Sequence, residues 1–454
     1  MPSLLRLAGV ISIMSVVSRR FTTARANLSS YCAGSSGYEA LPSDYRLDNV
    51  VVIHRHGDRA QIGRSIGPLW PEDDSITSFW GTKMPTQSSL KTLSGTFQSS
   101  VQSAGENMDM EGHLYAGEDH AAYPYAMLSE LGVSQLIAVG RHLRERYVGS
   151  GFMSADQSKS TDEIYIRSTN MCRTLLSLRG LIAGLYDVSG DTHSSVLHSK
   201  DALQVNTRPK VLETMFPQGG GPCASLAKRR AEILTPESYV EGISNFDIIE
   251  KKVRKVLGVE ADESVNWIRA KEILTCHRVH GREYITAISE EEEDKISEIA
   301  GWMWGQMYND DALNRLAIGR FLHELLLDID QRANQGGKKM LVYSGHDSTL
   351  VPVMCALKVY DNQWPPYASY LTLEMVTQKS TGARYVRASY NDRAVAMLGQ
   401  TEMLVPYQVF VDRLQTLALD NDAYWSACET NAEDAATLAA EMKKIDDEVR
   451  ATTS

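Results

Sequence analysis

The feature that most constrains this chain is an apolar run that ends in a histidine held between two arginines. The β-branched residues at 50–53 predict a buried strand, and Gly57 ends the strand soon afterwards. Arg55, His56 and Arg59 therefore lie where a strand meets a loop. Ligands of open α/β sheets bind beyond the carboxyl ends of the strands, and the planar fork of arginine suits phosphate. The sequence thus predicts an α/β sheet with a phosphate site at this strand end, where His56 is placed to attack phosphorus.

A zinc site is the competing interpretation of the same residues. His54, His56 and Asp58 have the H-x-H-x-D spacing of zinc hydrolases, and alternate strand residues point to the same face. Two observations argue against a metal. Arg59 stands at the next ligand position, where a guanidinium repels a dication, and the one further histidine pair, within 277–280, lies in a polar, basic segment. We expect the protein to use no metal and no other cofactor.

A second strand end repeats this arrangement. An apolar strand predicted over 339–343 is followed by Gly345, His346 and Asp347. In a parallel pair with the first strand, this histidine and carboxylate meet His56 at the same edge of the sheet. The imidazole of His346 is suited to bind the transferring phosphoryl group, and the carboxylic acid of Asp347 is suited to protonate a leaving oxygen.

A third strand, predicted over 163–167, ends in Arg167 and leads into a helix predicted over 172–186. We expect Ser168 or Thr169 to cap this helix. Arg167 would then lie at a strand end beside a helix N-terminus, and both positions favour an anion. A surface salt bridge is the alternative role for this arginine.

Together these motifs resemble the histidine acid phosphatases of the phosphoglycerate-mutase-like fold. The resemblance rests on Arg55-His56-Gly57-Asp58-Arg59, Arg167-Ser168-Thr169 and His346-Asp347, which occur in the family's order. It implies an α/β sheet domain flanked by helices. It also implies that His56 becomes phosphorylated, that Asp347 donates the proton, and that four residues bind the phosphate: Arg55, Arg59, Arg167 and His346. Gln61 stands where the family usually has proline, so we expect a different loop shape there.

Further segments resemble the type 6 lysophosphatidic acid phosphatase branch of this family, namely 131–147, 167–170, 181–186, 364–368 and 371–374. This resemblance implies a metal-independent acid phosphomonoesterase that acts through phosphohistidine. The implied substrate is lysophosphatidic acid or a related lysophospholipid, hydrolysed to monoacylglycerol and phosphate. Two alternatives stay open: the same chemistry on a phosphosugar, inositol phosphate or phosphoprotein, and a non-catalytic protein that binds phospholigands.

The composition is typical of a soluble enzyme. The chain has 454 residues, of which 43% are hydrophobic and 23% charged, and this length is enough to bury a large core. Its net charge of −11 argues against nucleic acid as a partner, so a local basic pocket must attract an anionic substrate. We expect a small phosphomonoester as the partner and no stable membrane span. No pattern in the sequence specifies the oligomeric state.

The order of the motifs predicts how the chain is divided. The predicted parts are a targeting segment (1–38), an α/β catalytic domain in two pieces (45–204 and 311–430), a mainly helical cap (205–310) and a C-terminal tail (431–454). Amphipathic helices are predicted over 131–148 and 313–333, within the catalytic domain.

Residues 1–38 have the composition of a mitochondrial transit peptide. They contain four arginines and many serines and threonines but no acidic residue. The secretory pathway or a lysosome-like compartment is the alternative, because 7–17 has the length of a signal-peptide apolar region. Cys172 and Cys355 lie in apolar patterns and are expected to be buried free thiols. Cys428 is expected to find a disulfide partner only in an oxidising compartment.

Overall fold

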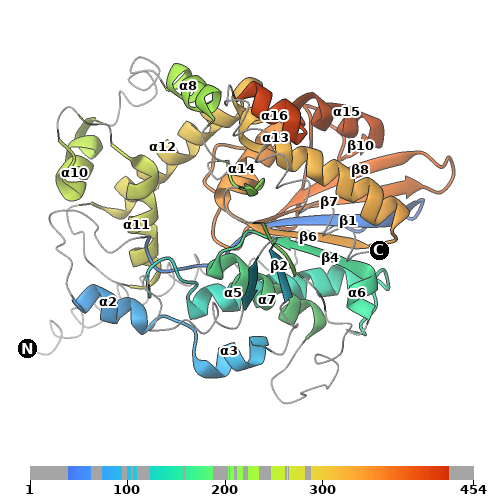
Figure 1. Ribbon diagram of the computed structural model, residues 1–454, viewed down its shortest axis with the longest axis horizontal. Coiled ribbons are helices and arrows are strands. Elements are labelled where there is room, and N and C mark those ends of the chain that lie inside the picture. Colours follow the sequence, from blue (N-terminus) through green and yellow to red (C-terminus); the bar gives the residue numbers. More distant parts are fainter. Residues whose placement is uncertain are drawn as a thin grey trace, which may run out of the picture.

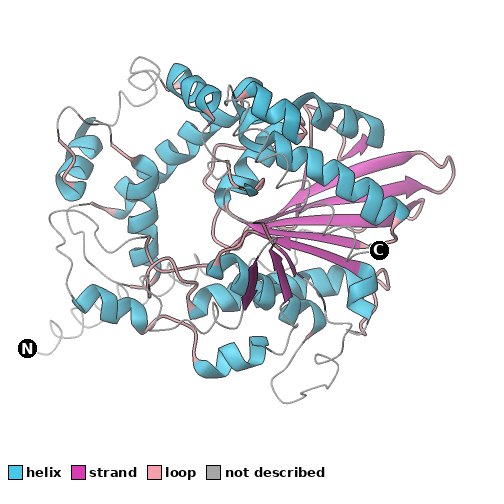
Figure 2. Ribbon diagram, viewed as in Figure 1, coloured by secondary structure: helices cyan, strands magenta, loops and turns pink. Residues whose placement is uncertain are grey.

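A mixed β-sheet runs through the centre of the computed structural model (Figure 2). The structure describes residues 39–428 except for 63–73, 95–99, 104–105, 110–122, 157–158, 188–202, 204, 209–211, 218–222, 235–246, 261–262, 264 and 282–287. In this part of the chain ten strands form the sheet: β1 (Tyr45–Arg55), β2 (Ser100–Ser103), β3 (Glu106–Asp109), β4 (Ile164–Ser168), β5 (Val205–Asn206), β6 (Met340–Gly345), β7 (Tyr370–Gln378), β8 (Arg384–Tyr390), β9 (Arg393–Val395) and β10 (Leu404–Pro406).

The strand order is β10-β8-β7-β1-β6-β4-β5-β2-β3, with β9 paired to β8. The central strands β1, β6 and β4 are parallel neighbours, and β7 and β8 extend the sheet in antiparallel fashion beyond β1. The strands predicted over 49–54, 163–167 and 339–343 thus lie side by side as β1, β4 and β6.

Helices cover both faces of the sheet, as Figure 1 shows, with α5 and α7 on one face and α13 and α15 on the other. The helices are α2 (Asp74–Gly81), α3 (Gln87–Ser94), α5 (Glu130–Leu143), α6 (Ser160–Glu163), α7 (Cys172–Tyr186), α8 (Ala224–Ile233), α10 (Asp247–Leu257), α11 (Trp267–Val279), α12 (Glu290–Tyr308), α13 (Asp311–Asp328), α14 (Asp347–Ala356), α15 (Tyr407–Leu417) and α16 (Asn421–Ala427). A π-helical turn extends α5 through Arg144–Val148 and another extends α13 through Ile329–Gln335. The helices predicted over 131–148, 172–186 and 313–333 are therefore present.

The alternation of side chains along β1 explains the two layers of helices. Val51 and Ile53 belong to one buried cluster, together with Phe321 of α13. Val50 and Val52 belong to the cluster on the opposite face, which includes residues of α5 and α7. Because both faces of β1 are covered, the strand is a continuous apolar run, as expected for a central parallel strand. The predicted fold class, an α/β sheet domain flanked by helices, is confirmed.

The register of the three parallel strands aligns their carboxyl ends. Arg55 of β1 lies opposite Gly345 of β6, and Ser344 of β6 lies opposite Ser168 of β4. The residues that follow these strands are therefore brought to one edge of the sheet, although they are far apart in the sequence.

Helices α10, α11 and α12 lie beyond this end of the strands (Figure 1). Residues of α10, α11 and α12 share their own buried cluster, centred on Trp267 and Ile296. A disulfide between Cys223 and Cys428 joins the start of α8 to the end of α16. The boundaries proposed for the cap stay a prediction, and β5 adds to the sheet from the first residues of that segment.

The structure differs from two sequence-based expectations, the N-cap of α7 and the burial of Cys172. A third expectation concerns the two terminal segments, the predicted targeting segment and C-terminal tail, which lie outside the described residues. The residue that precedes α7 is Met171, which makes no side-chain cap, so neither Ser168 nor Thr169 is the N-cap. Cys355 is a buried free thiol as expected, whereas the free thiol of Cys172 is only partly buried. No helix among the described residues is long and apolar enough to cross a bilayer.

Candidate active site

His56 lies directly after β1, on a loop that is packed tightly against helix α5. A side chain at Gly57 would place its Cβ 2.4 Å from the carbonyl oxygen of Gly132, so only glycine fits there. The backbone N–H of His56 donates to the carbonyl oxygen of Gly345 (3.0 Å), which ties this loop to the end of β6. The ring of His56 lies 5.5 Å from the ring of His346, measured between centroids.

The hydrogen bonding of the His56 ring defines which nitrogen is free to react. Nδ1 lies 2.8 Å from the carbonyl oxygen of Gly57, and a carbonyl only accepts, so Nδ1 carries the proton and donates. In the neutral ring, Nε2 therefore holds the lone pair. Burial, followed by the charges of Arg173, Arg55 and Arg59, lowers the pKa of His56 well below its usual value. Its surroundings therefore favour the neutral form of the ring, which is the nucleophilic one.

Arg55, the last residue of β1, links this strand to the predicted proton donor. Its Nη2 forms an ion pair with Asp347 Oδ2 at 2.7 Å, and Nη1 donates to the carbonyl oxygen of Pro365 at 2.5 Å. The guanidinium also lies over the ring of Tyr367, 4.1 Å from its centroid. Arg55 is almost fully buried, whereas the Asp347 side chain keeps 17% of its surface exposed. Asp347 is thus within reach of an entering substrate.

Arg59 is held by helix α11. Its Nη1 lies 2.7 Å from Glu272 Oε1, and the same oxygen accepts from the backbone N–H of Ile62 at 3.0 Å. Burial alone would lower the pKa of Arg59, but the negative charge of Glu272 raises it well above its usual value. Arg59 is therefore a permanent cation in this site.

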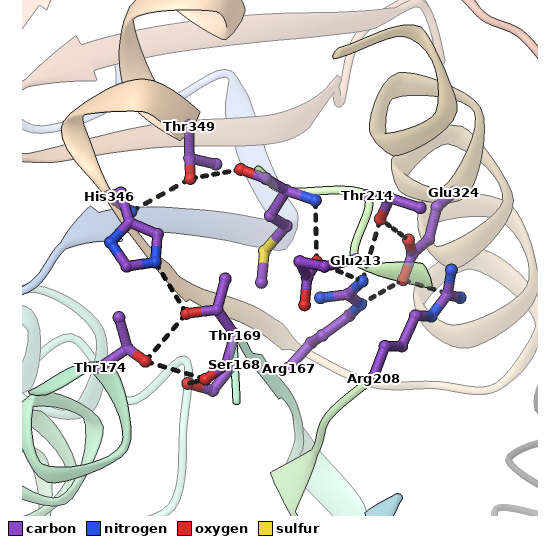
Figure 3. Close-up of polar contacts among 11 residues, drawn as sticks. Arg167, Ser168, Thr169, Thr174, Arg208, Glu213, Thr214, Glu324, His346 and Thr349 are labelled. Atoms are coloured by element: carbon purple, nitrogen blue, oxygen red, sulfur yellow. Dashed lines mark hydrogen bonds and ion pairs between the residues drawn. The ribbon is translucent and has the colours of Figure 1, made fainter. Parts of the chain in front are cut away.

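His346 is fixed from both sides. Its Nε2 lies 3.0 Å from Thr169 Oγ1, and its backbone N–H donates to Thr349 Oγ1 at 3.1 Å (Figure 3). Burial, then Arg173, Arg59 and Arg55, lower the pKa of His346 well below its usual value. His56 and His346 thus share an environment that three guanidinium groups make positive.

Arg167 is not brought together with the other predicted phosphate ligands. Figure 3 shows its side chain pointing toward Glu213 and Glu324, away from His346. Its Nη2 lies 2.8 Å from Glu213 Oε1, and its Nε lies 2.5 Å from Glu324 Oε1. Arg167 and Tyr165 lie on the same face of β4, the face covered by α13. The geometry places Arg167 in a buried ion-pair network with Glu213 and Glu324.

Arg173 is the arginine that the sequence reasoning missed. It lies in the first turn of α7 and makes no hydrogen bond or ion pair with another residue of the described part of the chain. Its charge is the largest electrostatic influence on both His56 and His346. Burial, followed by Arg59, lowers the pKa of Arg173 to about 10. A cation in a first helical turn opposes the helix dipole, and this was the signal in the sequence.

Helix α11 contacts the loop after β1 along one face. His280 Nε2 lies 2.6 Å from Asp58 Oδ2, and His277 Nε2 lies 2.5 Å from Gln61 Oε1. Gln61 also accepts from Trp80 Nε1 at 3.3 Å, so it is a buried contact where the family usually has proline. The histidine pair within 277–280, which was the one further pair considered for a zinc site, is thus engaged in two separate contacts with Asp58 and Gln61. Among the described residues no group of three or more His, Cys, Asp or Glu side chains is arranged to hold a metal.

The arrangement is suited to phosphoryl transfer. Arg55, Arg59 and Arg173 supply fixed positive charge around a histidine whose Nε2 is free, and the partly exposed carboxyl of Asp347 lies at the edge, paired with Arg55. Preorganised cations of this kind stabilise the charge that develops on phosphoryl oxygens.

The sequence is similar to those of several known phosphatases. Lysophosphatidic acid phosphatase type 6 of Bos taurus is 27% identical over 404 residues, which cover 84% of this chain and 86% of that protein. Prostatic acid phosphatase of Homo sapiens is 25% identical over 274 residues, which cover 59% of this chain and 69% of that protein.

Solved structures share the fold at lower identity. Hafnia alvei phytase in complex with tartrate has a TM-score of 0.54 and 13% identity, covering 86% of this chain and all (100%) of that chain. The Bifidobacterium longum multiple inositol polyphosphate phosphatase in complex with inositol hexasulfate has a TM-score of 0.52 and 14% identity, covering 86% of this chain and 97% of that chain. These likenesses establish the fold alone.

The family model of the histidine phosphatase superfamily (branch 2) matches residues 46–391. This match spans the three strand ends and the helices that lie between them. The chain therefore belongs to branch 2 of the histidine phosphatase superfamily, and it is an acid phosphatase, a phosphoric monoester hydrolase.

Proposed function

We propose that the protein hydrolyses lysophosphatidic acid, or a related lysophospholipid, through a phosphohistidine formed on His56 without a metal ion. The observation that carries the chemistry is the neutral His56 ring, with Nε2 free, next to Arg55, Arg59 and Arg173. The lipid substrate is supported by the similarity to lysophosphatidic acid phosphatases over 84% of the chain.

In the first step the Nε2 lone pair of His56 attacks phosphorus, and the bond between phosphorus and the alcohol oxygen breaks. The positive charges of Arg55, Arg59 and Arg173 stabilise the equatorial oxygens, and His346 binds one of them. Asp347 donates a proton to the departing alkoxide, so that a neutral alcohol leaves. In this assignment Arg173 takes the role that the sequence motif suggested for Arg167.

Phosphate binding is expected to disrupt the ion pair between Arg55 and Asp347. In the structure the two groups are 2.7 Å apart. A phosphate that takes over the Arg55 guanidinium leaves the Asp347 carboxyl beside a new negative charge. Like charges in close contact favour the protonated carboxyl, which is the form that a general acid needs.

In the second step water attacks the phosphorus of phosphohistidine, and the P–N bond breaks. The Asp347 carboxylate left by the first step accepts the proton of this water. His56 returns to its neutral form and inorganic phosphate is released. All the proton transfers of the cycle therefore use one carboxyl group and solvent.

The compartment is proposed from the first 38 residues, whose composition favours mitochondrial import. The Cys223–Cys428 disulfide favours an oxidising environment, which reducing compartments such as the cytosol do not provide. We therefore propose an oxidising mitochondrial space, with the secretory route as the alternative.

A trapping experiment tests the catalytic part of this proposal. Wild-type protein in excess chelator is mixed briefly with ³²P-labelled lysophosphatidate and quenched in alkali. We expect base-stable, acid-labile label on His56, and no label and no turnover in His56→Ala. The control His323→Ala, on helix α13 outside the site, should be labelled normally. Label on another residue, or activity that requires an added metal, would contradict the mechanism.

A substrate series tests the lipid part. Lysophosphatidates of increasing acyl length are compared with inositol phosphates, phosphosugars and a phosphotyrosine peptide. We expect kcat/KM to rise with acyl length, because each buried methylene contributes up to about 0.8 kcal/mol. A flat profile, or a preference for inositol phosphates, would reject the lipid substrate and leave the phosphatase chemistry intact.

A further inference from the structure

Lys271 is a buried lysine for which the proposed chemistry has no role. It lies on α11, next to Glu272, and only 8% of its surface is exposed. Its Nζ lies over the ring of Trp364, 4.7 Å from the centroid. It makes no hydrogen bond or ion pair with any other residue in the described ranges. A buried ammonium without an acceptor is costly, so such a group is a candidate for binding a ligand.

Lys271 is connected through Trp364, Pro365 and Arg55 to Asp347, the residue proposed to protonate the departing alcohol. Trp364 precedes Pro365, whose carbonyl accepts from Arg55, and Arg55 is paired with Asp347. The charges of Arg55 and Asp347 both act on Lys271. Asp347 is the group proposed to protonate the leaving oxygen. The ammonium therefore lies near Arg55 and near the carboxyl proposed to protonate the leaving oxygen.

The surroundings of Lys271 favour an uncharged oxygen as its ligand. The titratable groups that act on it most strongly are Arg55, Asp347, Cys276 and Glu272, and only the first of these is a cation. A second phosphate dianion would need more positive charge than one ammonium stacked on an aromatic ring. The Trp364 ring also packs on an apolar neighbour, Trp304, at 4.3 Å between ring centroids.

Building on the proposed function, we propose that Lys271 forms a leaving-group subsite. Its ammonium donates a hydrogen bond to a hydroxyl or ester carbonyl oxygen of the alcohol, and so selects phosphomonoesters of polyols and of their esters over those of plain alcohols. Glycerol phosphate and its acyl esters carry such oxygens next to the scissile bond, whereas propyl phosphate carries none.

The ionisation of Lys271 gives this subsite a pH signature. Burial, followed by the charge of Arg55, lowers the pKa of Lys271 to about 7, against the opposite effects of Asp347, Cys276 and Glu272. The ammonium is therefore charged at acidic pH and loses its proton as the pH rises through neutrality. The ratio of kcat/KM for glycerol 3-phosphate to that for propyl phosphate should fall above neutral pH. Groups that act on both substrates alike cancel in this ratio.

The test uses the full-length protein, a matched set of variants and three substrates with the same carbon chain. The substrates are propyl phosphate, glycerol 3-phosphate and propane-1,3-diyl bisphosphate. Lys271→Met removes the donor but keeps the length of the side chain, and Lys271→Gln keeps a donor. Lys255→Met is the matched control. It makes the same substitution at an exposed lysine of α10, a helix that packs with α11.

We expect Lys271→Met to lower kcat/KM for glycerol 3-phosphate by about 10- to 100-fold, the usual effect of losing a hydrogen bond from a charged donor. The loss for propyl phosphate should stay within about threefold, since that substrate offers no acceptor. Lys271→Gln should recover part of the loss, and the pH dependence of the ratio should disappear in Lys271→Met. Thermal unfolding should show that all variants are folded.

Three results would overturn the inference. Equal losses for propyl and glycerol phosphates would mean that Lys271 acts on the phosphate or on the fold. A loss confined to the bisphosphate would make this a subsite for a second phosphate. If the ratio of kcat/KM for glycerol 3-phosphate to that for propyl phosphate does not depend on pH in the wild type, the ammonium does not recognise the alcohol. Wild-type protein that hydrolyses neither these three substrates nor lysophosphatidate would instead reject the proposed function itself.

Discussion

Two arginines that lie six residues apart illustrate how much depends on the direction of a single side chain. Arg167 ends a strand and belongs to a sequence motif, but its side chain points to the face of β4 covered by α13, where Glu324 binds it. Arg173 lies in the first turn of the helix that follows, and its charge lowers the pKa of both His56 and His346. The motif located the right segment, whereas the alternation of side chains along the strand decided which arginine reaches the site.

The two arginines should therefore respond differently to the same substitution. Arg173→Met should reduce kcat/KM by about 10²–10³-fold and weaken inhibition by inorganic phosphate, because one stabilising charge is lost from the transition state. Arg167→Met should leave Glu213 without its ion-pair partner and Glu324 with Arg208 alone, and it should lower the free energy of unfolding by about 3–5 kcal/mol. Steady-state kinetics and denaturant unfolding measure the two effects. The assignment fails where Arg167→Met abolishes phosphate binding in a stable protein and Arg173→Met does not.

Among the elements, helix α11 is the one that joins the phosphate site to the segment predicted to be the cap. Glu272, Cys276 and His280 lie four residues apart and so share one face, and they contact Arg59, Tyr367 and Asp58 respectively. The sequence of this helix did not predict these contacts. Its two histidines, His277 and His280, were considered there only as zinc ligands. Contacts between segments 91 to 222 residues apart have no signature in local spacing.

Glu272 is expected to weaken phosphate binding by its charge. Glu272→Gln keeps the oxygen that accepts from Arg59 and Ile62 but removes the negative charge beside the anion site. Inorganic phosphate should then inhibit roughly 3- to 10-fold more strongly, which corresponds to about 1 kcal/mol. Glu272→Ala removes both features and should lower kcat, because Arg59 is no longer oriented. Inhibition constants at one pH, with p-nitrophenyl phosphate as substrate, distinguish the two variants; unchanged inhibition in Glu272→Gln would exclude the electrostatic role.

For the molecule as a whole, the buried His54 in the central strand links stability to pH. Burial lowers the pKa of His54 to about 4, and this effect is only partly offset by the hydrogen bond from Nδ1 to the carbonyl oxygen of Arg55. In the unfolded chain histidine titrates near its ordinary value of about 6.5. Between these two values the unfolded chain binds a proton that the folded protein does not. The contribution of His54 to the free energy of unfolding is therefore fully present above pH 6.5. It falls as the pH is lowered toward 4 and changes no further below that pH.

The variant His54→Asn isolates this contribution, because asparagine does not titrate and can donate to the same carbonyl. Between pH 6.5 and pH 4 the wild type should lose about 3 kcal/mol more free energy of unfolding than the variant. Urea unfolding at several pH values measures the difference. Parallel curves for the two proteins would show that His54 is protonated in the folded state.

The sequence by itself determined the fold class, the three strands and the residues at two of their ends. Strands buried on both faces need continuous β-branched runs, and a break by glycine marks where each run ends, so these features are written in adjacent residues. The tertiary structure alone decided that Arg173 and not Arg167 acts on the two histidines, that Glu272 of α11 pairs with Arg59, and that Cys223 pairs with Cys428. These outcomes depend on which face of an element is turned inward and which distant segments meet, and such information arises only when the parallel strands align and the helices pack against their ends.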